Sequence, residues 1–145
     1  FELYFRRLEV ERMYPGLQGL GFAMNLDTPS FDAAQARLAA LPSARPLWPE
    51  GARDRYSSII RLQPQDARNQ AAMGFDMLSE QARRSAMLRA AETGRPAITA
   101  TVRLVQEIDQ QAVQPGYLIY DAVLDQDGVL LGWAYSPIRA HDFLS

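Results

Sequence analysis

Residues 74–105 read GFDMLSEQARRSAMLRAAETGRPAITATVRLV, and this stretch decides the fold. Ser79 is suited to cap the start of a helix, and the Ala, Met, Leu and Arg residues that follow favour helix. Gly94 and Pro96 end that helix, because glycine accepts the left-handed conformation that often follows a helix and proline cannot continue one. From Ala97 the pattern changes to a period of two, which predicts a strand over 97–106.

One face of the predicted helix over 79–93 is apolar except for a single charge. Arg83 lies in the middle of the face formed by Ala82, Ala86, Met87 and Ala90. A guanidinium directed at an apolar interior needs a partner. Arg83 therefore either reaches water or pairs with a buried carboxylate, or it anchors an anionic ligand beneath the helix as a bidentate clamp.

The composition bounds the function. The chain has 145 residues, 48% of them hydrophobic, and a net charge of -2, so we expect one globular domain that binds no nucleic acid. All 15 basic residues are arginine, there is no cysteine, and His141 is the only histidine. These counts exclude lysine Schiff-base and thiolate chemistry, and they give no catalytic set or metal-ligand spacing. We expect no enzyme activity, no metal and no cofactor in this segment.

The remaining elements follow from apolar spacing and from glycine and proline breaks. Asp125–Gly128 is typical of a tight turn between two antiparallel strands. The expected fold is α+β, a PAS-like antiparallel sheet with helices packed on one face, preceded by an N-terminal helix. The expected helices are 1–13, one starting with Thr28 as its cap, and 64–73; the expected strands are 17–26, 56–62, 97–106, 116–124 and 129–136.

We interpret residues 1–145 as a single domain cut from a longer protein. Its core spans 17–137, and the start of an exit helix spans 138–145. No run of about 18 apolar residues occurs, so we place any membrane helices outside this segment. An apolar stripe of Phe1, Phe5 and Leu8 either forms the seam of a homodimer or packs on the core of its own domain.

Four blocks of the sequence resemble the CHASE domain family. They read YPGLQGLGFA at 14–23, GFDMLSEQARRSAMLRAAETGRPAITATVRLVQE at 74–107, QPGYLIYDAV at 114–123 and GWAYSPIRAHDFL at 132–144, and together they cover about half of the chain. The resemblance implies a periplasmic or extracellular sensor held between two membrane helices, ahead of a histidine kinase, nucleotide cyclase or diguanylate cyclase output. Plant members of the family are cytokinin receptors.

The resemblance also implies positions for the ligand site. Asp76 and Met77 match an Asp-Met pair of the family, and the Asp that binds adenine in cytokinin receptors falls at Arg83. A Thr needed for signalling falls at Thr99, and pocket positions fall near Val105, Tyr120 and Gly132. The candidate ligand-binding residues are thus Met77, Arg83, Met87, Thr99, Thr101, Val105, Tyr120 and Gly132.

Two departures from the family change the expected ligand. Arg83 replaces an acceptor with an obligate cation, and Tyr120 places a ring where plant members carry a small Thr. We therefore expect a small anionic molecule, and not a cytokinin, between the helix 79–93 and the strands after it. The alternative is a module without a small ligand, whose filled pocket leaves it to recognise a periplasmic protein.

Overall fold

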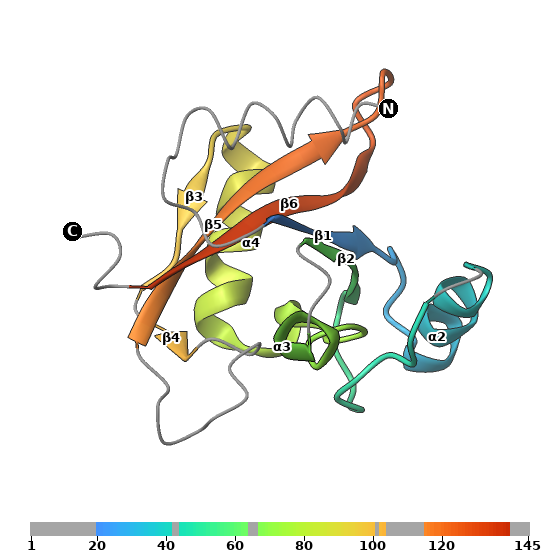
Figure 1. The fold of residues 1–145 in the computed structure, drawn as a ribbon. Helices are drawn as coiled ribbons and strands as arrows, with labels where there is room; N and C mark the ends of the chain where they lie inside the picture. The colour runs from blue at the N-terminus through green and yellow to red at the C-terminus, as the bar shows by residue number, and fades with distance from the viewer. Residues whose placement is uncertain (1–19, 42–43, 64–66, 101, 104–114, 140–145) are drawn as a thin grey trace.

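A computed structural model gives the structure of the chain and describes residues 20–41, 44–63, 67–100, 102–103 and 115–139. Its centre is an antiparallel sheet of strand order β2-β1-β6-β5-β3, with β4 pairing farther along β5 (Figure 1). The strands are β1 (Leu20–Asn25), β2 (Ser57–Gln63), β3 (Ala97–Ile98), β4 (Val102–Arg103), β5 (Pro115–Leu124) and β6 (Leu130–Arg139). The α+β, PAS-like fold expected from the sequence is confirmed.

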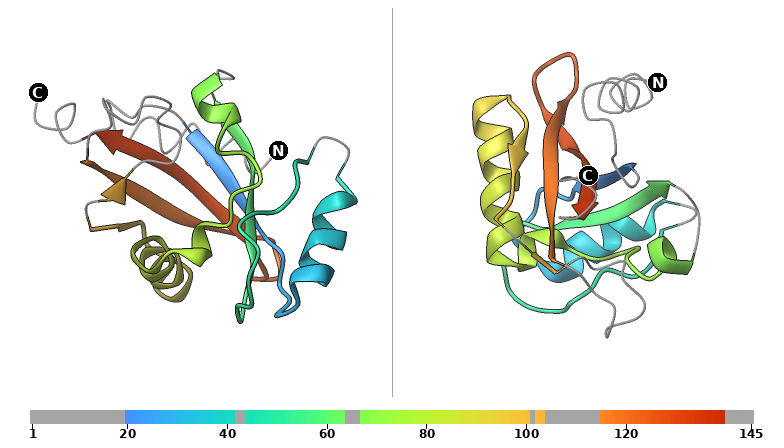
Figure 2. Two further views of the ribbon diagram at one scale, coloured as in Figure 1. Left: turned by 90° about the horizontal axis from the view of Figure 1, so that it is seen from below. Right: turned by 60° about the vertical axis from the view of Figure 1, so that its left-hand side comes forward.

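The helices pack beside this sheet, and α4 is the longest of those described. Figure 2 shows α4 running along one side of β5 and β6, while α2 lies near the edge formed by β1 and β2. The helices are α2 (Phe31–Ala39), α3 (Ala67–Gln70), the 3-10 helix η1 (Met77–Ser79) and α4 (Gln81–Thr93). None of the helices in the described ranges has the length and hydropathy needed to cross a bilayer.

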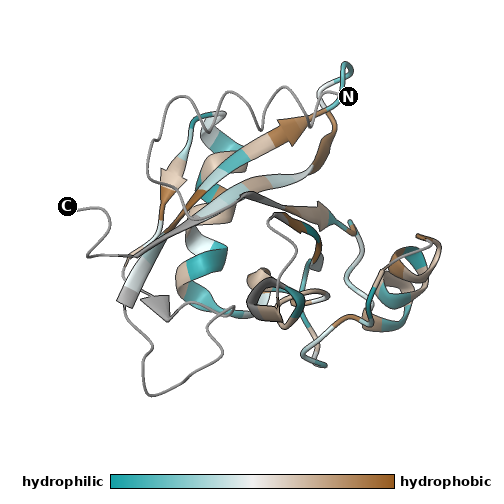
Figure 3. Cartoon of the chain, in the orientation of Figure 1, coloured by the Kyte–Doolittle hydropathy of each residue, from teal (hydrophilic) through white to brown (hydrophobic). Residues whose placement is uncertain are grey.

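The pattern of α4 is the one that the sequence predicts. Its buried residues are Arg83, Ala86, Met87 and Ala90, and Ala82 packs partly buried against the same core. Hydrophilic residues occupy most of the rest of the helix (Figure 3). Gly94 ends it with φ of 70°, in the left-handed region. A short helix that is mostly polar is therefore held by one narrow buried stripe, with an arginine in that stripe.

Several predicted helix boundaries are wrong, because a neighbouring residue, and not the predicted one, caps the helix. Ser79 belongs to η1, which Asp76 caps, so α4 begins after Glu80. Ser30, and not Thr28, caps α2, since its hydroxyl accepts the N–H of Ala33 at 3.2 Å. The expected short helix over 64–73 reduces to α3 among the described residues.

The other differences concern the strands. The predicted strand over 97–106 is interrupted, with β3 and β4 as separate two-residue pairings along β5. The exit helix expected from 138 is wrong for its first two residues, because Ile138 and Arg139 continue β6 opposite Tyr117 and Gly116. Residues 140–145 and the predicted N-terminal helix 1–13 lie outside the described residues.

Candidate functional site

Arg83 belongs to α4, and its side chain points into the interior of the protein. The residue is only 1% exposed, and its guanidinium lies 5.9 Å from the centre of the Phe75 ring. It forms an ion pair with Glu80, three residues earlier, whose side chain remains 42% exposed. Burial lowers the pKa of Arg83, and the nearby Tyr120 and Tyr135 offset part of that effect. Arginine nevertheless stays charged, so the site is a buried cation that needs a negative neighbour.

Tyr120 and Tyr135 reach this cation from neighbouring strands. Tyr120 on β5 pairs with Tyr135 on β6 in the register of the sheet, and their rings stack with centroids 5.7 Å apart. The hydroxyl of Tyr120 donates to the sulfur of Met77 at 3.0 Å. Burial raises the pKa of both tyrosines, so their hydroxyls stay protonated at neutral pH. The site therefore offers hydroxyl groups as well as the positive charge.

Met87, another predicted site residue on α4, is bonded to the sheet through its backbone. The indole N–H of Trp133 donates to the backbone oxygen of Met87 at 2.8 Å, which ties α4 to β6. Met77, Met87, Tyr120, Tyr135 and Trp133 are each at most 2% exposed, and all belong to one hydrophobic core cluster. The structure thus brings together Met77, Arg83, Met87 and Tyr120 of the predicted site, within an interior that aromatic rings fill.

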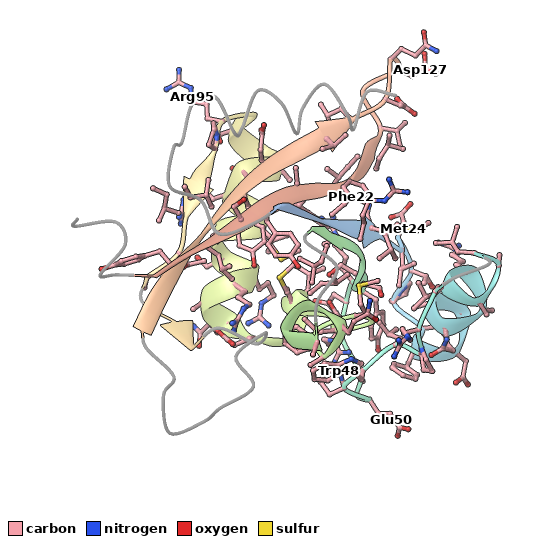
Figure 4. The ribbon with its side chains drawn as sticks, in the orientation of Figure 1. Phe22, Met24, Trp48, Glu50, Arg95 and Asp127 are labelled. Carbon is pink, nitrogen blue, oxygen red and sulfur yellow. The ribbon has the colours of Figure 1, made fainter. Side chains whose placement is uncertain are left out.

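The two other described residues of the predicted site, Thr99 and Gly132, lie at the sheet. Thr99 is held against β5, where its backbone N–H donates to the Leu118 oxygen at 2.9 Å and its hydroxyl accepts the Leu118 N–H at 3.0 Å. A side chain at Gly132 would meet Phe22 and the backbone of Ala23, and Figure 4 shows Phe22 beside β6. Because Trp133 and Tyr135 face α4, Gly132 belongs to the opposite face of the sheet.

Thr101 and Val105, the remaining predicted site residues, lie outside the described residues. In the described ranges, no group of three or more His, Cys, Asp and Glu side chains is arranged to hold a metal ion. In the acidic turn Asp125–Gly128, the Asp125 carboxylate accepts hydrogen bonds from the backbone N–H groups of Asp127 and Val129, so it serves to hold the turn.

A second buried charge, Asp76, lies next to the site. Its carboxylate is fully buried and accepts the backbone N–H of Ser57 at 3.1 Å, the Ser57 hydroxyl at 2.8 Å and the N–H of Leu78 at 2.9 Å. The Arg53 Nε donates to its other oxygen at 2.9 Å. Burial raises the pKa of Asp76, and the Ser57 bond and the charge of Arg53 offset part of that rise. This network fixes the turn that carries Met77 to the start of β2.

The sequence reasoning missed Glu80, Tyr135 and the Asp76 network as parts of the site. A carboxylate three residues before a buried arginine was a readable signal for the Glu80 pair, because such residues share a helix face. Tyr135 could have been found by placing it opposite Tyr120 across the Asp125–Gly128 turn. Arg53 lies in a proline-rich and charged connection and carries no local signal for its distant partner.

The comparisons with known proteins agree with this architecture. The family model described as CHASE domain matches residues 1–145, which is the whole chain. No curated protein matches the chain. Among solved structures, an extracellular ligand binding receptor from Desulfohalobium retbaense DSM5692 is similar with a TM-score of 0.52 and 14% identity. The match covers 94% of this chain but only 18% of that receptor chain, so the likeness concerns the fold.

Proposed function

The chain belongs to the CHASE domain family, an extracellular sensory domain, and we propose that it binds a small anionic molecule between α4 and the strands after it. The observation that carries this proposal is the buried guanidinium of Arg83 beneath α4. A cation with that little exposure requires negative charge close by. Glu80 supplies this charge in the structure, and the ligand's carboxylate or phosphate would take its place, with the hydroxyls of Tyr120 and Tyr135 as further donors.

Glu80 supports a binding step in which one anion replaces another. Its carboxylate pairs with Arg83 but keeps 42% of its side chain exposed, so it can swing into water without being buried elsewhere. A ligand anion would take its place on the guanidinium, which stays compensated throughout. Because Glu80 is also the N-cap residue of α4, a ligand that displaces its side chain would act at the start of the helix that covers the site.

The wider receptor belongs to the same proposal. We place the domain in the periplasm, between membrane helices of a bacterial histidine kinase or diguanylate cyclase, and expect it to act as a homodimer. Sequencing the residues that flank positions 1 and 145 in the parent gene checks the receptor class. Light scattering of the Leu8→Asp variant checks the dimer, because a charge in its apolar seam would yield monomers.

A second function has support in the filled interior. Tyr120, Tyr135 and Trp133 occupy the space between α4 and the sheet, and Glu80 already compensates Arg83. A domain of that kind would recognise a periplasmic protein without a small ligand. The two functions differ in one measurable respect, which is whether small anions stabilise the folded domain through Arg83.

The test is thermal unfolding of the 145-residue chain with acetate, pyruvate, malate, phosphate and adenine derivatives. We expect an anion to raise the melting temperature, and the Arg83→Met variant to lose that rise. The Glu80→Gln variant removes the competing carboxylate and should bind the anion about tenfold more tightly, or about 1.4 kcal/mol. Glu92→Gln, an exposed glutamate of the same helix, is the matched control and should change nothing.

Each other outcome contradicts the proposal. If adenine derivatives raise the melting temperature and anions do not, the domain would belong with the cytokinin-binding members of the family. No stabilisation of the wild type or of Glu80→Gln by any anion would favour the protein-recognition module.

A further inference from the structure

A hollow lies on the solvent side of α4 and has a volume of about 550 Å³. One wall is the connection that leads to β2, with Arg53, Asp54 and Arg55. The other wall is formed by Leu78 of η1 and by Arg84 and Leu88 of α4. Arg83 is not among the residues that line it. Volumes of about 300–1,000 Å³ are typical of sites for small molecules.

The charge in this hollow opposes that of the whole chain. Three arginines and one aspartate line it, whereas the chain carries a net charge of -2. Glu50, the next acidic residue of the same connection, extends outward at the far end of that loop (Figure 4). The buried carboxylate of Asp76 already pairs with Arg53. Of the remaining charged residues that line the hollow, Arg55 and Arg84 are positive and only Asp54 is negative. The hollow therefore favours anions over cations and neutral molecules.

Two of these guanidinium groups are fixed in place before any ligand arrives. Arg53 donates to Asp76 and to the Pro49 oxygen, and its guanidinium lies 4.7 Å from the centre of the Tyr56 ring. Arg84 donates through one terminal nitrogen to the Leu78 oxygen at 3.1 Å. A guanidinium has five N–H donors, so each group keeps donors beyond these bonds. Fixed donors lose little side-chain entropy on binding an anion.

The hollow also has an apolar part. Two leucines line the hollow among its mostly charged residues. Leu88 of α4 is 40% exposed, and Leu78 of η1 is buried. An exposed leucine beside fixed cations matches a ligand with an acidic head and a short apolar body. We infer that this hollow is a second binding site, separate from Arg83, for short aliphatic carboxylates.

The site would be connected to the interior cluster through Asp76. The carboxylate that holds Arg53 also holds the turn of Met77, whose sulfur accepts from Tyr120. Occupation of the hollow can thus change the bond network of the Arg83 cluster without a ligand inside it. This site does not depend on the proposed function, because the two sites lie on different sides of α4.

The experiment is a titration of the 145-residue chain with hexanoate, followed by NMR of two reporters. The Leu88 methyl groups report the hollow, and the indole N–H of Trp133, bonded to Met87, reports the interior. We expect saturable shifts of the Leu88 signals, and a tenfold or larger rise in the dissociation constant for Arg84→Gln. Hexylamine and hexanol, which share the alkyl chain, should not shift the Leu88 signals.

Arg89→Gln is the matched control. Arg89 also belongs to α4 and donates to a backbone oxygen, that of Ile98, but it does not line the hollow. Its removal should leave hexanoate binding unchanged. Equal shifts with hexanol, equal loss in Arg84→Gln and Arg89→Gln, or shifts of Trp133 alone would each overturn the inference. The last outcome would leave the interior site standing.

Discussion

Removal of the Asp76 carboxylate should destabilise the domain strongly. In the Asp76→Ala variant, the Ser57 N–H, the Ser57 hydroxyl and the Leu78 N–H lose their common acceptor inside the protein. Ser57, Asp76 and Leu78 are each at most 1% exposed, so water does not reach these groups in the folded state. Arg53 loses its buried partner as well, although its own side chain is 14% exposed.

The size of the effect follows from these four groups. A buried donor left without an acceptor costs about 1–3 kcal/mol, and the cavity left by the carboxylate admits water that recovers part of it. Taking about 1 kcal/mol for each of the three donors and for Arg53 gives a loss of about 4 kcal/mol. For a domain of this length that loss lowers the melting temperature by about 10 °C.

The assay is urea unfolding followed by the fluorescence of Trp48 and Trp133. Asp76→Asn is the control, because its side-chain oxygen still accepts from Ser57 and Leu78 while only the pair with Arg53 is lost. We expect Asp76→Asn to cost clearly less than Asp76→Ala, because the cost of burying the carboxylate charge offsets much of what the pair with Arg53 contributes. A loss below about 1 kcal/mol for Asp76→Ala, or equal losses for the two variants, would refute the reasoning, since acceptance of these hydrogen bonds would then not be what Asp76 contributes.

Three further predictions concern stability. Because burial raises the pKa of Asp76 above its ordinary 3.8, the native state holds this proton more tightly than the unfolded chain. The advantage of wild type over Asp76→Asn in urea should therefore shrink as pH rises from 3.8 through the raised pKa, and an advantage that grows would contradict it. Gly132→Ala should cost about 3 kcal/mol in thermal unfolding, since its Cβ would lie 2.1 Å from the Ala23 oxygen between paired strands. Gly94→Ala meets open space at φ of 70° and should cost only about 1 kcal/mol, so equal losses for the two alanines would be inconsistent with a packing effect.

The functional interpretation depends on the contrast between Arg83 and Arg84. The two arginines are adjacent in the sequence, yet one is buried beneath α4 and the other is exposed and lines the outer hollow. Successive residues of a helix point about 100° apart, so adjacent residues of α4 can face the interior and the outer hollow. Variants at these two positions should therefore separate the interior site from the outer one.

Local features of this protein could be predicted from the sequence because their causes lie within a few residues. The buried stripe of α4, the left-handed Gly94 and the turn Asp125–Gly128 depend on helical spacing and on backbone preferences. The position of Arg83 on the apolar face of the helix could be predicted for the same reason, but its partner could not. The α+β class followed from the order of such elements along the chain.

Only the tertiary structure decided what these residues contact. Arg53 and Ser57 meet Asp76 across 23 and 19 residues, and Trp133 meets Met87 across 46, so no local pattern encodes these bonds. Among its described residues, the strand predicted over 97–106 forms two separate pairings with β5, at Ala97–Ile98 and at Val102–Arg103. A side chain's spacing fixes the direction in which it points, whereas its partner depends on which distant segment folding brings there.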